Sequence, residues 1–168
     1  VFRAVHELWS AQVDIGGRYT TSTFDVLGQR QESNDTGWVG DASVIYSGER
    51  TNANFTFSND IAPAYGYVGA VQRTAGVLNL RRRFLHDISG TFLAGYYRNK
   101  SQAGQYSFRA IDEQSTRLRP GIRWEATKNI VLDAAYQFTW LRNELTGGTT
   151  VQNYAYAGAT LSYPFFDE

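Results

Sequence analysis

Few side chains in this sequence could carry out covalent or metal chemistry. The chain of 168 residues contains no Cys, and its two imidazoles are His6 and His86. Without thiolates there can be no disulfide, Cys nucleophile or Cys-ligated metal, and two separated imidazoles are a poor set for a zinc or haem centre. Each His directly precedes an acidic residue, Glu7 or Asp87, in a short polar segment that a repeated turn explains. We therefore expect no enzyme activity, no bound metal and no cofactor.

A second set of charged residues recurs at alternate positions. Its basic members are Arg18, Arg73, Arg81, Arg117, Arg119 and Arg123, and its acidic members are Asp14, Asp41 and Asp133. Six Arg less three Asp leave this set with a charge of +3. Arg117, Arg119 and Arg123 share one segment, and such a basic ladder attracts anionic solutes or an acidic polymer. The whole chain, with 16 Lys+Arg and 16 Asp+Glu, has zero formal net charge, so it has no electrostatic basis for binding nucleic acid.

The segments that position these side chains alternate between apolar and polar residues. In the clearest segment, the alternate positions are Ile130, Leu132, Ala134, Tyr136, Phe138 and Trp140. This period of two is typical of a strand with one apolar face. Eight such segments occur in pairs, with short polar turns at Glu7, Glu49, Asp87 and Asn129. Successive turns are 42, 38 and 42 residues apart, which indicates a repeated hairpin.

Longer polar or glycine-containing stretches separate the predicted strands at the other end, at 23–35, 60–69, 99–113 and 142–150. Short turns at one rim and long loops at the other are typical of outer-membrane barrels. Several alternating runs reach ten or more positions. A tilted strand needs roughly 9–11 residues to cross a bilayer, whereas strands of a soluble β-sandwich, the alternative fold, usually have about 5–6. The sequence therefore predicts an all-β fold: one antiparallel transmembrane β-barrel domain over residues 1–168, with eight strands visible.

The apolar face of these strands has two further features. The only charged residue expected on this face is Arg82, which lies beside a turn. Aromatic residues gather near its ends, as in the belts that anchor barrels at the two membrane surfaces. The predicted girdle comprises Trp38, Tyr46, Trp124, Phe138, Trp140 and Tyr163. Pro120 interrupts one predicted strand, and because proline cannot donate to the ladder, we expect a bulge, an edge or a segment above the bilayer there.

Two interpretations of the polar face stay open. If eight strands close on themselves, their side chains just fill the interior, and Arg–Asp pairs form a solid polar core. If the strands belong to a wider barrel, the same side chains line a wet lumen. The sequence begins at Val1 without an initiator Met, and residues 1–5 have the pattern of the end of an earlier strand. We therefore expect the chain to begin in the middle of a barrel.

The final strand carries a recognisable signal. Tyr156-Ala-Gly158-Ala-Thr-Leu161-Ser-Tyr163 resembles the segment by which the barrel assembly machinery recognises bacterial outer-membrane barrels, although an acidic tail follows it. Together with turns such as 48–51, the stretch 58–63 and a last strand after a Gly-Gly loop, the chain resembles the β-barrel porin type 2 family. That resemblance implies the C-terminal part of an outer-membrane barrel linked to exopolysaccharide export. It also implies outer-membrane lipid, the assembly machinery and periplasmic export components as partners.

The expected function is that of a passive channel or secretion component in a Gram-negative outer membrane, with polysaccharide as the cargo. The alternative is a small closed barrel without a pore, acting as a structural anchor or as an adhesin through loops such as 99–113. An outer-membrane enzyme is a further rival, which the turn positions of His6 and His86 disfavour.

Overall fold

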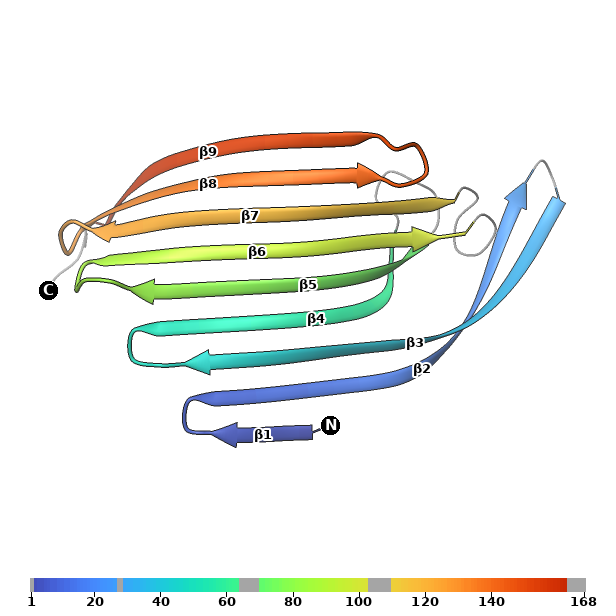
Figure 1. Ribbon diagram of the computed structural model, residues 1–168, viewed down its shortest axis with the longest axis horizontal. Helices are drawn as coiled ribbons and strands as arrows, with labels where there is room; N and C mark the ends of the chain where they lie inside the picture. The colour runs from blue at the N-terminus through green and yellow to red at the C-terminus, as the bar shows by residue number, and fades with distance from the viewer. Residues whose placement is uncertain (1, 27–28, 64–69, 103–109, 163–168) are drawn as a thin grey trace, which may run out of the picture.

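The described residues form one antiparallel sheet in which nine strands lie side by side in chain order (Figure 1). The computed structural model describes residues 2–26, 29–63, 70–102 and 110–162. The strands are β1 (Phe2–His6), β2 (Trp9–Val26), β3 (Gln29–Ser47), β4 (Thr51–Pro63), β5 (Ala70–Arg83), β6 (Ile88–Ser101), β7 (Ile111–Glu125), β8 (Ile130–Asn143) and β9 (Thr149–Leu161). The eight predicted strands are confirmed as β2 to β9, and the short β1 precedes them.

In the described part of the chain, no helix has the length and apolar character needed to cross a membrane.

Strand boundaries agree with the predicted turns but not with all of the predicted loops. Residues 7–8, 48–50, 84–87 and 126–129 connect strands at one end of the sheet, as the spacing predicted. The predicted loop at 23–35 is wrong, because β2 and β3 remain paired as far as Val26 and Gln29. This hairpin projects beyond the other strands (Figure 1). A backbone ladder needs no apolar side chains, so polar composition did not mark its end.

Pro120 is neither at an edge nor in a bulge. It lies within β7, an interior strand, and is opposite Phe92 of β6. On the other side, the ladder with β8 lacks pairs at Arg119 and Pro120 but resumes at Gly121 in an unchanged register. Because proline has no amide proton, pairing is lost locally in one ladder, and the pairs on either side keep the two strands in register.

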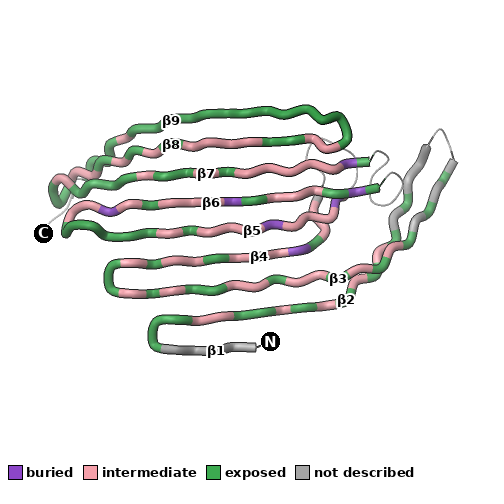
Figure 2. The backbone as a smooth tube through the Cα atoms, in the orientation of Figure 1, coloured by how far each residue is buried: buried purple, intermediate pink, exposed green. Residues whose placement is uncertain are grey.

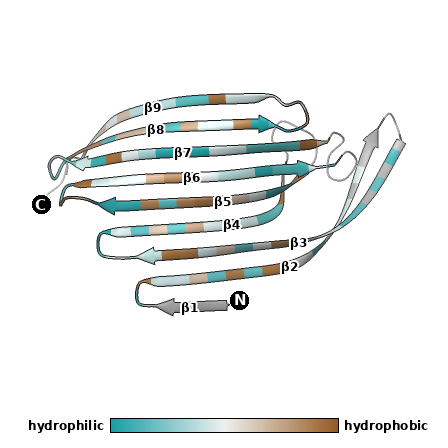
Figure 3. Cartoon of the chain, in the orientation of Figure 1, coloured by the Kyte–Doolittle hydropathy of each residue, from teal (hydrophilic) through white to brown (hydrophobic). Residues whose placement is uncertain are grey.

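Register divides the sheet into two faces of different chemistry. One, the apolar face, carries the odd positions of β2, β4 and β9 and the even positions of β3 and β5 to β8. The other is the polar face. The alternating colours along the strands in Figure 3 reflect this division. The pairing also slides along the strands: the row that starts at Ala11, the third residue of β2, reaches Phe138, beyond the middle of β8. Such a stagger is what closing a sheet into a barrel requires.

The sheet has almost no apolar core. Among the described residues, the buried hydrophobic side chains are Val71, Ala75 and Ile111, all on the polar face. Buried positions, in purple, are correspondingly sparse along the chain (Figure 2). By contrast, 22 large hydrophobic residues are exposed, and register places 14 of them on the apolar face. Ile15 is 78% exposed and Leu161 74%. An apolar surface of this extent requires a non-aqueous environment or a partner to cover it.

The two faces can be tested with a pair of adjacent, identical residues. Ala134 lies on the apolar face of β8 and Ala135 on the polar face. If lipid covers the apolar face, Ala134→Arg should lower the free energy of unfolding from the lipid bilayer by about 2–4 kcal/mol, because a guanidinium near the bilayer midplane loses hydration. Ala135→Arg is the matched control and should cost little. Urea titration in lipid vesicles measures both, and equal costs would contradict the assignment of the faces.

Candidate functional site: the charged polar face

The six predicted basic residues all lie on the polar face, but their surroundings differ. Arg18 forms an ion pair with Asp35, with Nη2 and Oδ2 2.7 Å apart, and its side chain is only 11% exposed. The guanidinium carbon of Arg73 lies 4.9 Å from the centre of the Tyr97 ring. These two cations are held by neighbouring groups within the sheet.

Arg123 is loosely neutralised. Its Nη1 is 3.8 Å from Oδ1 of Asp133, the residue opposite it in register, and its Nε is 3.7 Å from Oε1 of Glu125. Both distances exceed those of hydrogen bonds, and the Arg123 side chain is 44% exposed. Arg123 and Asp133 thus form a long ion pair between partly exposed groups.

Arg81, Arg117 and Arg119 are exposed, and within the described part of the chain none of their guanidinium groups makes a hydrogen bond or an ion pair. A solid polar core needs paired charges, because an unpaired buried charge is strongly destabilising. The exposure of these three guanidinium groups is therefore typical of a wet surface.

The predicted acidic residues gather elsewhere. Asp14 of β2 is directly opposite Asp41 of β3, and Asp14 accepts a hydrogen bond of 2.8 Å from Gln12. Asp60 of β4 joins them around one depression on the polar face. Asp14, Asp41 and Asp60 thus lie on β2 to β4. The exposed Arg residues lie on β5 and β7, and Asp133 and Glu125 accompany Arg123. In the described ranges, no group of three or more His, Asp or Glu side chains could hold a metal ion.

A cavity of about 580 Å³ opens on the polar face between β3 and β9. Arg81, Arg119, Arg123 and Asp133 line it, but Arg117 does not. Sequence spacing groups Arg117 with the other two β7 residues, whereas cross-strand register brings in Arg81 from β5. This regrouping depends on how the strands pair, which the sequence pattern of one strand does not contain.

The predicted girdle residues that the structure describes all lie on the apolar face: Trp38, Tyr46, Trp124, Phe138 and Trp140. The Tyr46 ring packs against Trp9, a residue the girdle prediction missed, with ring centres 4.7 Å apart. The Trp124 indole donates a 2.9 Å hydrogen bond to Asp87 in the β5–β6 turn. Tyr163 lies outside the described residues.

A row of polar residues that sequence analysis missed ends the apolar face at the loop side of the sheet. We call it the polar border. It comprises Asn59, Gln72, Thr74, Arg98, Asp112, Gln114 and Arg142, all on the apolar face, together with Glu144 just after β8. Arg82 is therefore not the only charged residue on this face. The border was missed because its residues lie near the ends of the predicted strands or in predicted loops. Asp112, for example, falls in the predicted loop 99–113, whereas β6 continues to Ser101 and β7 starts at Ile111.

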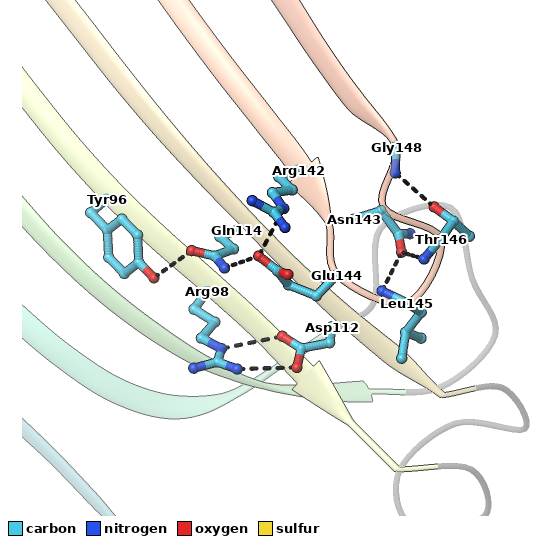
Figure 4. A network of polar contacts seen from close by, with 10 residues as sticks. All are labelled: Tyr96, Arg98, Asp112, Gln114, Arg142, Asn143, Glu144, Leu145, Thr146 and Gly148. Atoms are coloured by element: carbon cyan, nitrogen blue, oxygen red, sulfur yellow. Dashed lines mark hydrogen bonds and ion pairs between the residues drawn. The ribbon is translucent and has the colours of Figure 1, made fainter.

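Hydrogen bonds connect the polar border across neighbouring strands. Arg98 donates two to the carboxylate of Asp112, at 3.2 and 3.1 Å (Figure 4). Tyr96 donates to Gln114, which in turn donates to Glu144, and Glu144 is also ion-paired with Arg142. Figure 3 shows the corresponding hydrophilic ends of β6 and β8.

The polar border sets the height of the apolar band. On β8 the band runs from Ile130 to Trp140. The ten steps from Ile130 to Trp140, at about 3.4 Å each and tilted by about 45°, span about 24 Å, close to the apolar band of about 25 Å on outer-membrane barrels.

Comparison with known proteins supports the same fold. No protein-family model matches the sequence, and no curated protein matches it. Among solved structures, the chain is similar to in-vitro folded OmpT, an outer membrane protein of Vibrio cholerae, with a TM-score of 0.58 and 10% sequence identity. The match covers 95% of this chain and 53% of the OmpT chain, so this chain spans about half of OmpT's length. At this identity the likeness shows the fold alone: an antiparallel β-barrel of the outer-membrane type.

The polar border makes a prediction about stability. Asn59 is 1% exposed; it donates to the Trp38 carbonyl and accepts from Gln72 and Thr74. Asn59→Ala should lower the free energy of unfolding by about 1–3 kcal/mol, because it leaves buried partners unsatisfied. Asn79→Ala, on the exposed polar face, is the control and should stay within about 0.5 kcal/mol. Equal losses in a urea titration would show that the Asn59 hydrogen bonds do not hold the border.

Proposed function

We propose that this protein is a passive channel in the outer membrane of a Gram-negative cell, with lipid against its apolar face and a water-filled passage along its polar face. The supporting observation is the separation of chemistry between the faces. Exposed large hydrophobic residues dominate one face, where charged residues lie towards the strand ends, and the predicted set of Arg and Asp residues occupies the other. Soluble proteins rarely expose an apolar surface of this kind, whereas a transmembrane barrel must.

Three unpaired guanidinium groups favour a passage over a filled interior. Arg81, Arg117 and Arg119 are exposed on the polar face, without ion pairs among the described residues. Cations in a narrow, partly desolvated passage attract anions and exclude other cations. The proposed cargo is therefore anionic. The resemblance to the β-barrel porin type 2 family implies a polysaccharide, and the exposed Arg residues favour an acidic one. Outer-membrane lipid, the barrel assembly machinery and periplasmic export components are the proposed partners, and the proposal includes no catalytic step.

Ion selectivity tests the channel directly. Changing Arg117, Arg119 and Arg123 together to Gln should shift the reversal potential in a salt gradient towards cation preference, because three positive charges leave the passage. The thermal midpoint of unfolding should change little, since the Arg123 ion pairs are long and partly exposed. Arg50→Gln, in the β3–β4 turn, is a control for loss of a positive charge outside the strands.

Two results would contradict this proposal. An unaltered reversal potential with a large drop in the thermal midpoint would identify the three Arg residues as parts of a filled core. Absence of any current from folded protein in planar bilayers would leave the anchor or adhesin as the remaining function.

Orientation in the membrane can be tested because the chain has no Cys. Outer-membrane barrels have short periplasmic turns and longer extracellular loops. A single Cys at Leu145, exposed in the β8–β9 loop, should react with a membrane-impermeant maleimide on intact cells. A single Cys at Glu49, in the β3–β4 turn, should react only after the outer membrane is permeabilised. The reverse pattern would invert the proposed topology.

A further inference from the structure

One row of the polar face forms a trough across five strands. Register aligns Arg81 of β5, Thr91 of β6, Gly121 of β7, Ala135 of β8 and Tyr156 of β9. The three middle residues have small side chains, and the two outer ones are long. This row therefore has a low floor with a guanidinium at one end and an aromatic ring at the other, and all five residues line the 580 Å³ cavity.

Two more Arg residues flank the floor of the trough. Arg119 and Arg123 lie two residues to either side of Gly121 on β7, and their side chains share its face. The Arg81 Cα lies two strands away, at about 10 Å given a strand spacing of about 4.8 Å. Because an extended Arg side chain reaches more than half that distance, Arg81 and Arg119 can converge on one oxyanion above Gly121. Asp133 partly offsets Arg123, at 3.8 Å, and leaves the other two as the stronger anion binders.

Ile45 and Leu93 make part of the cavity wall apolar, and other residues of the wall suit a polyhydroxylated ring. Tyr156 is 46% exposed, and its ring occupies the space above Gly158 of the same strand, so it is held against the sheet. An aromatic face fixed in this way can pack against the apolar face of a pyranose. Asn52 and Asn79, exposed on the same cavity wall, supply amides that both donate and accept hydrogen bonds, as sugar hydroxyls require.

We propose that this trough is a saturable binding site for a carboxylated sugar unit, with Arg81 and Arg119 on the carboxylate and Tyr156 against the ring. The inference deepens the proposed function, on which it rests in taking the polar face to be wet. A uniform basic field would attract any anion in proportion to its charge. The trough instead distinguishes Arg119 from Arg117, which lies on the same strand and face but outside the cavity.

Calorimetric titration of the folded protein in detergent micelles, with a trimer of galacturonic acid as the probe, tests this site. Wild type should bind the trimer saturably and should not bind a neutral trimer of galactose. Arg81→Gln and Arg119→Gln should each weaken binding by about tenfold or more, since each removes a charge-assisted contact. Arg117→Gln, the matched control of equal charge, should stay within about twofold of wild type.

Two variants of Tyr156 test the contact between its ring and the sugar. Tyr156→Ala should weaken binding by about tenfold and Tyr156→Phe should retain it, because the ring face and not the hydroxyl makes the contact. Tyr154→Ala, on the same strand and face but outside the cavity, should have no effect.

The inference would be overturned if wild type that is folded, as shown by heat-modifiable migration on a gel, did not bind the trimer, or if it bound the neutral trimer equally well. Displacement of the trimer by sulfate at equal charge concentration, or an equal loss of affinity in Arg117→Gln and Arg119→Gln, would also overturn it. The titration requires no current. Trimer binding by a protein that conducts no ions would therefore refute the channel and support the binding site. Anion-selective current without trimer binding would support the channel and refute the binding site.

Discussion

The continuous backbone ladder is the interaction on which this structure depends. In most domains of this size a packed apolar core holds the elements together, but here the described residues bury only three hydrophobic side chains. What joins the strands is the antiparallel pairing of each strand with the next from β1 to β9. In a hydrocarbon layer this ladder becomes obligatory, because a backbone amide there has no water to bond. A single gap at Pro120 is tolerated since the flanking pairs keep the register.

Because the ladder holds the sheet, its two faces are free to serve different surroundings. The apolar face carries exposed Trp, Tyr, Phe, Ile and Leu side chains and ends abruptly at the polar border. The polar face carries opposed charges on different strands: Asp14 and Asp41 on β2 and β3, Arg81 and Arg119 on β5 and β7. An ordinary soluble sheet would cover its apolar side with a second layer; here no second layer exists among the described residues.

The alternation of residues predicted the eight long strands and the correct face for every candidate residue that the structure describes, because a period of two persists through each ladder without a shift. It failed where polar residues continue a strand, as at 23–35 and around Arg98 and Asp112, since backbone pairing is indifferent to side-chain polarity. It could not predict that Arg81 shares a cavity with Arg119 while Arg117 does not. That grouping is set by turn length and by the stagger across three strands, β5 to β7, which local periodicity does not encode.

The central claim, that lipid covers the apolar face, is tested most directly by tryptophan fluorescence. All four Trp residues of the chain, Trp9, Trp38, Trp124 and Trp140, lie on that face. In vesicles of brominated phospholipid, their emission should be strongly quenched, more by bromine near the head groups than by bromine deep in the acyl chains, because the residues lie towards the ends of the band. Aqueous iodide should quench little. Strong quenching by iodide with none by brominated lipid would place the apolar face outside the bilayer and contradict the account.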